Sequence, residues 1–84
     1  MTANPADEAE GHRPAIKRYI RYLIRDSAEA EDLTQETFLR AHQQRRALRD
    51  PGALESWLYQ IATHISIDRM RQRARTPAIG IQTP

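Results

Sequence analysis

The chain has 84 residues, no cysteine and a formal net charge of +2. A chain of this length can close only one modest hydrophobic core, and it has no disulfide to reinforce that core. No apolar run is long enough to span a membrane, and the polar start MTANPADEAEG is unlike a signal peptide. We therefore expect a cytoplasmic protein, which also suits the absence of cysteine.

The charge is distributed unevenly along the chain. Residues 1–36 hold eight acids and five bases, a net charge of −3, whereas residues 37–84 hold eight arginines and three acids, a net charge of +5. This division indicates two different surfaces. Twelve of the thirteen basic residues are arginine, whose planar group suits phosphate and carboxylate. A genome that favours arginine codons explains the same bias at least as well.

The pattern along the chain predicts an all-α fold, a small three-helix domain over residues 13–75. Residues 1–12 are expected to form a flexible, acidic arm. Residues 76–84 contain two prolines and one glycine and are expected to form a linker. No β pattern, internal repeat or low-complexity segment is present in the sequence.

The first helix is predicted from Pro14 to about Arg25, because proline is favoured in a first helical turn. Apolar residues at helical spacing predict one buried side, formed by Ile16, Tyr19, Ile20, Leu23 and Ile24. The opposite side carries Arg18, Arg21 and Arg25. We interpret this side mainly as solvated surface, with a nucleic-acid role as the less favoured alternative.

The second helix is predicted to begin at Asp26 or Ser27 and to end at about Gln44. Both residues at its start are good N-caps, and Glu29 follows Asp26 by three residues, as in a capping box. The core side is expected to hold Ala30, Leu33, Thr37, Phe38 and Ala41.

A third helix is predicted from about Ala53 to Arg73, after the basic connection QRRALRDPG with its turn-forming Asp-Pro-Gly. Its inward side is expected to hold Leu54, Trp57, Leu58, Ile61, Ala62 and Ile65. A separate stripe, well away from that side, consists of Gln60, His64, Ile67 and Arg71.

The second helix also presents an unusual outer side, formed by Asp32, Gln35, Glu36 and Leu39 at spacing i, i+3, i+4, i+7. Leu39 is therefore expected to be exposed, with two carboxylates and an amide around it. Such a surface suits protein docking, since carboxylates receive Arg or Lys and a leucine fills a small pocket. One exposed leucine is also ordinary, so docking and plain solvated surface are weighed equally.

The stripe on the third helix offers a second candidate surface. Gln60 and His64 can exchange hydrogen bonds with a ligand, and Arg71 can reach a phosphate. Arginine beside Trp57 and Tyr59 suits single-stranded or locally opened nucleic acid. The alternative is that most of the Trp57 ring is core and that the terminal arginines complement the helix dipole.

Catalysis finds little support in the sequence. No cluster of histidine, cysteine and acid has metal-ligand spacing, and no glycine-rich phosphate loop is present. Three short helices are also expected to leave little room for a ligand pocket. We predict no enzyme, with no catalytic residue, no cofactor and no metal.

Two segments, AEAEDLTQETFLRA and SWLYQIATHISIDRMR, resemble the signature of extracytoplasmic-function (ECF) sigma factors. The resemblance covers about residues 14–75, the region 2 domain of that family. Two long motifs in the right order and separation are far more specific than a charge pattern. The resemblance implies that residues 76–84 start an interdomain linker, and that the chain is an excised domain without the family's helix-turn-helix reader of the −35 element; a natural stand-alone domain is the less favoured alternative.

The resemblance implies two sets of contacts. Asp32, Gln35 and Glu36 would meet basic groups on the clamp helices of the β′ subunit of core RNA polymerase, and Leu39 would supply the apolar contact. The third helix and the preceding loop would recognise and help to melt the −10 promoter element on the non-template strand. The positions implied to face this DNA are Gln60, Thr63 and His64, with Arg71 on phosphate.

One position departs from the family pattern. Relatives commonly carry Asn where this chain has His64, and a neutral histidine offers one donor and one acceptor in a different geometry. The resemblance therefore carries no base preference to this position. An anti-sigma protein that covers one of the two surfaces is a further implied partner. The competing hypothesis is a helical protein-interaction module without DNA binding, and a regulator that reads duplex DNA is a third, less favoured one.

Overall fold

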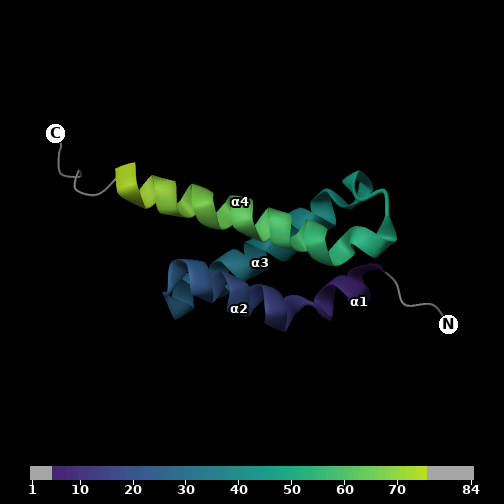
Figure 1. The fold of residues 1–84 in the computed structure, drawn as a ribbon, viewed down its shortest axis with the longest axis horizontal. Coiled ribbons are helices and arrows are strands. Elements are labelled where there is room, and N and C mark those ends of the chain that lie inside the picture. Colours follow the sequence, from purple (N-terminus) through teal and green to yellow (C-terminus); the bar gives the residue numbers. More distant parts are fainter. Residues whose placement is uncertain (1–4, 76–84) are drawn as a thin grey trace.

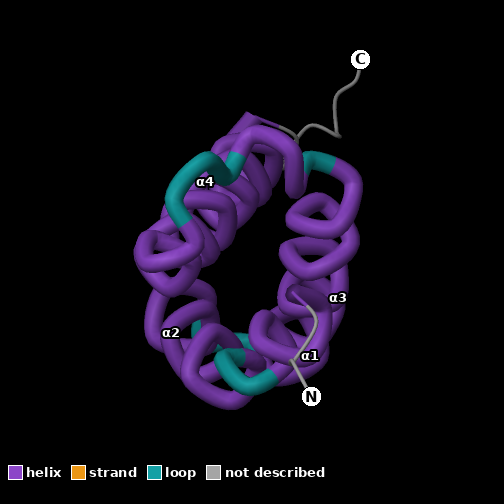
Figure 2. The backbone as a smooth tube through the Cα atoms, turned by 90° about the vertical axis from the view of Figure 1, so that its right-hand side faces the viewer, coloured by secondary structure: helices purple, strands orange, loops and turns teal. Residues whose placement is uncertain are grey.

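The structure is a computed structural model that describes the backbone of residues 5–75 and the side chains of residues 8–75. Its helices are α1 (Pro5–Glu10), α2 (Arg13–Ile24), α3 (Ser27–Gln43) and α4 (Leu54–Arg75) (Figure 1). Two 3₁₀ turns, Arg45–Ala47 and Pro51–Ala53, connect α3 to α4. Each of α2, α3 and α4 contacts the other two, and Figure 2 shows them side by side around one axis. This arrangement confirms the predicted all-α fold with three main helices.

Helix α1 lies within the segment expected to be a flexible arm, so the residue pattern misses this helix. Ala9 packs against the core, and the Glu10 carboxylate accepts two hydrogen bonds from the Arg13 guanidinium, at 2.7 and 3.0 Å. Six residues are too few for a helix that is stable alone. Its packing against α3 and α4 therefore supplies the stability that the local sequence does not. The expected linker, residues 76–84, lies outside the described residues.

Helix α2 begins with Pro14 in its first turn, as predicted, and buries Ile16 and Ile20 completely. Its C-cap, Arg25, has a left-handed backbone with φ of 68°. The Arg25 N–H donates to the carbonyl of Arg21 at 2.8 Å and closes the last turn.

Helix α3 is capped by Asp26, whose carboxylate accepts a hydrogen bond from the backbone N–H of Glu29 at 2.9 Å. This confirms the predicted N-cap. The reciprocal half of a capping box is absent, because the Glu29 carboxylate pairs with α4 instead. The buried hydroxyls of Thr34 and Thr37 donate to carbonyls one turn earlier, at 2.6 and 2.8 Å, so their burial leaves no unpaired polar group.

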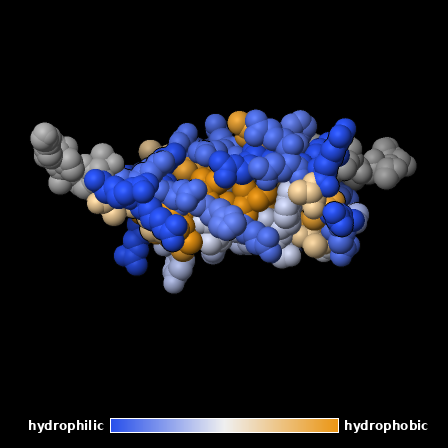
Figure 3. Space-filling model, turned by 90° about the horizontal axis from the view of Figure 1, so that it is seen from above, coloured by the Kyte–Doolittle hydropathy of each residue, from blue (hydrophilic) through white to orange (hydrophobic). Residues whose placement is uncertain are grey.

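The core lies between α2, α3 and α4 and contains all of the inward residues predicted for α3. Its buried apolar residues are Ile16, Ile20, Ala30, Leu33, Phe38, Ala41, Leu58, Ile61, Ala62 and Ile65. Of the other predicted inward residues, five are only half-buried: Tyr19, Leu23, Ile24, Leu54 and Trp57. From above, the surface is mostly hydrophilic, with apolar side chains visible near the middle of the molecule (Figure 3).

Helix α4 is buried only along part of its length. Its fully or nearly fully buried residues lie between Leu58 and Ser66, and the last turns project beyond the end of α2 in Figure 1. None of the described helices is long and apolar enough to cross a membrane. The projecting turns leave the end of α4 accessible to a partner.

Candidate docking and nucleic-acid surfaces

The outer side of α3 has the exposure that its spacing predicts. Leu39 is 57% exposed, whereas its neighbour Phe38 is 7% exposed and Leu33 is fully buried. We call the surface formed by Asp32, Gln35, Glu36 and Leu39 the docking face. Together with Arg40 and Gln43 these side chains line a shallow groove on the outside of the bundle. A groove with an apolar centre and a polar rim suits contact with another protein.

The acids on this side of α3 are tied to α4 by Arg69. Its Nη1 donates a hydrogen bond to Oε2 of Glu29 at 2.6 Å, and its Nη2 lies 3.6 Å from Asp32 and 3.7 Å from Glu36. Arg73 Nη2 lies 2.8 Å from the other Glu29 oxygen. The hydrogen bond with Glu29 is the main cause that raises the pKa of Arg69, and it opposes the effect of burial. The sequence reasoning missed this network, because it joins residues forty positions apart.

The network includes two acids of the docking face, Asp32 and Glu36, and leaves both side chains partly exposed. The side chain of Glu29 is 12% exposed, whereas those of Asp32 and Glu36 are 67% and 41% exposed. Arg40 also contacts Glu36, at 3.5 Å. The acids are thus partly neutralised from within the chain, since both oxygens of Glu36 lie within 4 Å of an arginine, and Asp32 is the more exposed of the two.

On α4, the stripe predicted from spacing is largely exposed. We call Gln60, His64, Ile67 and Arg71 the α4 stripe; Ile67 is half-buried and the other three are exposed. Arg71 makes no ion pair with another residue in the described part of the chain. An exposed row of amide, imidazole and guanidinium groups can bind phosphates and base edges.

Thr63 lies beside this stripe and is half-buried. Its hydroxyl donates to the carbonyl of Tyr59 at 2.7 Å and lies 2.7 Å from the hydroxyl of Tyr19. Because a hydroxyl has one proton to donate, Tyr19 is the donor in the second bond. The rings of Tyr19 and Tyr59 pack edge to face, with centroids 5.0 Å apart. The Thr63 hydroxyl therefore holds α2 against α4, and a DNA contact through it stays a prediction.

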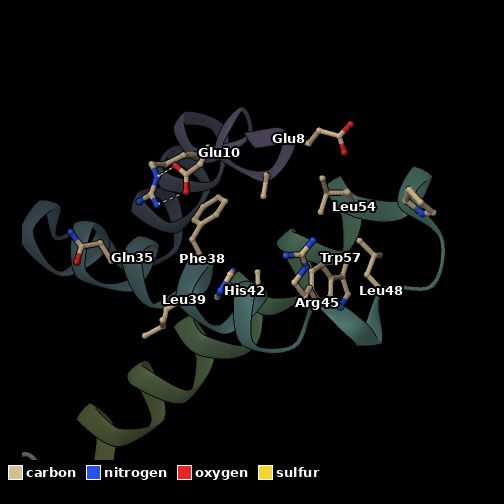
Figure 4. Close-up of a pocket in the computed structure, with 14 residues that line it drawn as sticks. Glu8, Glu10, Gln35, Phe38, Leu39, His42, Arg45, Leu48, Leu54 and Trp57 are labelled. Carbon is tan, nitrogen blue, oxygen red and sulfur yellow. Dashed lines mark hydrogen bonds and ion pairs between the residues drawn. The ribbon is translucent and has the colours of Figure 1, made fainter. Parts of the chain in front are cut away.

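A cavity of about 500 Å³ lies between α1, α3 and the start of α4, so the expectation of little room for a pocket is wrong (Figure 4). The short helix α1 and the 3₁₀ connection create it, and neither was included in the three-helix prediction. Its apolar lining includes Phe38, Leu39, Leu48, Leu54 and Trp57. Arg13 stands over the Phe38 ring at 4.6 Å from the centroid, and Trp57 is half-buried at the core edge. Among the described residues, no group of three or more metal-binding side chains is present.

Comparison with known proteins identifies the family. Residues 9–76 match the model of sigma-70 region 2. The chain belongs to the sigma-70 region 2 family. This confirms the resemblance carried by the two motifs and the prediction of a non-enzymatic domain.

Curated relatives of this sigma-70 region 2 domain are ECF sigma factors. It is 38% identical over 64 residues to "ECF RNA polymerase sigma factor SigE" of Mycolicibacterium smegmatis, covering 76% of this chain. It is 32% identical over 68 residues to SigW of Bacillus subtilis, covering 81% of this chain. The chain spans 24% of the length of the first relative and 36% of the second. No solved structure matches it significantly.

Proposed function

We propose that this domain serves in bacterial transcription initiation, as the part of an ECF sigma factor that docks on RNA polymerase and engages the promoter. The observation that carries the proposal is the exposure of both family motifs on separate helices. Leu39 in the first motif is 57% exposed on α3, and Gln60 and His64 in the second are exposed on α4. The protein acts by binding, with no chemical step of its own.

For the docking face we propose the clamp helices of the β′ subunit as the partner. The carboxylates of Asp32 and Glu36, on side chains that are 67% and 41% exposed, are suited to receive Arg or Lys, and Gln35 adds a neutral donor and acceptor. Leu39 would be buried against the partner. Burial of its apolar surface would supply affinity that ion pairs at the rim of the interface do not.

For the α4 stripe we propose the −10 element on the non-template strand. Gln60 and His64 would meet base edges and Arg71 a phosphate, and Thr63 would support the stripe from its side. Because few phosphates are contacted, we expect the isolated domain to bind DNA weakly, with a small slope of log affinity against log salt, about 0.7 for each phosphate contacted on a single strand. This assignment also places the protein in the cytoplasm, together with the polymerase.

The test compares two identical substitutions on the two surfaces. Gln35→Ala should weaken binding to a purified β′ clamp-helix fragment and leave binding to a −10 single strand unchanged. Gln60→Ala should do the reverse, and circular dichroism should show native helicity for both variants. The role of the negative charge is tested with Glu36→Gln. The charge reversal Glu36→Arg is avoided, because a third guanidinium beside Arg40 and Arg69 would disturb the fold.

Two other results would change the proposal. If the folded domain binds no clamp-helix fragment, the sigma assignment of the docking face is wrong. If Gln60→Ala, His64→Ala and Arg71→Ala leave every DNA interaction unchanged while Gln35→Ala abolishes protein binding, the domain is a helical protein-interaction module. We further propose that an anti-sigma protein covers one of the two surfaces, which co-purification with the full-length factor would test.

A further inference from the structure

Helix α2 and its C-cap carry three arginines whose charge has no partner in the described part of the chain. Arg18, Arg21 and Arg25 are all exposed, and none forms an ion pair there. The other two cations of the same helix are both engaged: Arg13 pairs with Glu10, and Lys17 pairs with Glu31 of α3. The unpaired arginines therefore lie on one side of α2, and the paired cations lie elsewhere.

An aromatic ring stands among these arginines. Tyr22 is 75% exposed, more than the other large exposed apolar residues Leu39 and Met70. Helical spacing places Arg18, Arg21 and Tyr22 on one side of α2, opposite the buried Ile16 and Ile20, and Arg25 follows as the C-cap of the same helix. We call these four residues the arginine face.

The backbone at Arg25 adds an independent observation. A left-handed C-cap is the position where glycine is favoured, because a Cβ atom makes this conformation strained. The chain nevertheless holds an arginine there. Cations near a helix C-terminus complement the dipole, which accounts in part for Arg21 and Arg25. The dipole does not account for Arg18, one turn earlier, or for the exposed ring of Tyr22.

The helices that carry the arginine face and the α4 stripe, α2 and α4, pack against each other. Tyr19, which is next to Arg18 and three residues before Tyr22, is hydrogen-bonded to Thr63 beside that stripe. Figure 2 shows α2 and α4 as neighbours on one side of the bundle, with α3 on the other. An extended ligand that lies along the α4 stripe can therefore continue onto α2 without crossing another helix.

We propose that the arginine face is a second contact surface for single-stranded DNA, in which the guanidiniums bind backbone phosphates and Tyr22 stacks on a base. Alternating phosphates and flat bases match alternating guanidiniums and an exposed ring better than an acidic protein surface does. The inference rests on the proposed function, since promoter melting supplies the single strand. It adds a surface that the two family motifs do not contain.

The test measures binding of a short labelled single strand to the 84-residue chain by fluorescence anisotropy, between about 50 and 200 mM salt. Arg18→Gln and Arg21→Gln should each reduce the slope of log affinity against log salt by about 0.7, the value for one phosphate contact on a single strand. Tyr22→Ala should weaken binding about fivefold or more, and Tyr22→Phe should retain wild-type affinity. Lys17→Gln is the matched control, because it removes one charge from the same helix at a residue already paired with Glu31.

Arg25→Gly separates a binding role from a structural one. Glycine relieves the left-handed backbone, so this variant should unfold at a higher denaturant concentration and yet bind the single strand more weakly. If Arg25 served only to stabilise the end of α2, Arg25→Gly would not combine weaker DNA binding with higher stability. Unchanged DNA affinity in a stabilised Arg25→Gly variant would count against its place in the surface.

The α4 variants distinguish failure of this inference from failure of the proposed function. If Arg71→Ala weakens binding while the arginine-face variants match wild type, the inference is wrong and the proposed function stands. If the arginine-face variants weaken binding while Gln60→Ala and Arg71→Ala do not, the inference holds and the α4 assignment is wrong. Two results would overturn the inference. In the first, the wild-type chain does not bind a single strand at low salt. In the second, the variants lose binding to anionic vesicles but keep their binding to the single strand.

Discussion

Among single residues, Ser66 is the clearest departure from ordinary packing. It is fully buried in α4, and its hydroxyl has no hydrogen-bond partner within the described residues. An unpaired buried hydroxyl costs free energy, and alanine is also the better helix former. We predict that Ser66→Ala raises the free energy of unfolding by about 1 kcal/mol, measured by urea titration.

The matched control for this substitution is Ser56→Ala in the first turns of the same helix. Ser56 is exposed, and its hydroxyl donates a 3.3 Å hydrogen bond to the carbonyl of Ala53. The control should change stability by less than about 0.5 kcal/mol. Equal effects of the two substitutions would show that the buried hydroxyl is not the cause.

Two leucines on α3, Leu33 and Leu39, differ in what their removal should do. Leu33 is fully buried, so Leu33→Ala should lower the free energy of unfolding by about 2–5 kcal/mol through lost burial and a new cavity. Leu39 is 57% exposed, so Leu39→Ala should cost much less stability and should instead weaken binding to the polymerase fragment. Urea unfolding and a binding titration on both variants check this. A large stability loss from Leu39→Ala would show that Leu39 mainly stabilises the fold.

Between elements, the Glu29–Arg69 pair is the shortest ion pair from α3 to α4 among the described residues. Its hydrogen bond is 2.6 Å long and the Glu29 side chain is only 12% exposed. We predict that Glu29→Gln lowers the free energy of unfolding by about 1–2 kcal/mol. Amide hydrogen exchange should also accelerate in the last turns of α4, because Arg73 loses the same partner.

Glu31→Gln is the control for this prediction, with the same chemical change two residues along α3. Glu31 pairs with Lys17, and both side chains are about half exposed, so its removal should have the smaller effect. A larger stability loss from Glu31→Gln than from Glu29→Gln would contradict the importance assigned to the α3–α4 link.

Features that depend on neighbouring residues within one helix could be predicted from the sequence, whereas features that depend on contacts between helices could not. Local rules were sufficient for the Asp26 cap and for the exposure of Leu39, because neighbouring residues on one helix determine both. The partner of Glu29 was not predictable, since it depends on how α3 crosses α4. The same holds for α1, whose order comes from tertiary packing, and for the cavity that α1 helps to enclose.

For the whole molecule, stability should fall in acid. Hydrogen bonds from Arg13 and Lys17 lower the pKa values of Glu10 and Glu31 below the ordinary value of 4.5. A carboxyl with a lower pKa in the folded than in the unfolded chain stabilises the fold above its unfolded pKa. That contribution disappears as the pH falls through the folded pKa, so the loss should begin near pH 4.5 and continue below it.

Thermal unfolding across this pH range measures the effect. Both carboxylates are largely solvated, so we expect a modest decrease in the unfolding midpoint. The double variant with Glu10→Gln and Glu31→Gln should show a flatter dependence on pH than wild type. Identical pH profiles would assign the acid sensitivity to other groups.

The ion pairs of α3 have a consequence for the rate at which a partner arrives. Each of its four acids, Glu29, Glu31, Asp32 and Glu36, has a cation of this chain within 4 Å, and the four cations are Lys17, Arg40, Arg69 and Arg73. The field that α3 projects into solvent is therefore close to neutral. If this surface meets polymerase, as proposed above, the two would associate by unsteered diffusion, with rate constants near 10⁵–10⁶ M⁻¹s⁻¹ that change little with ionic strength, on the order typical of neutral protein pairs.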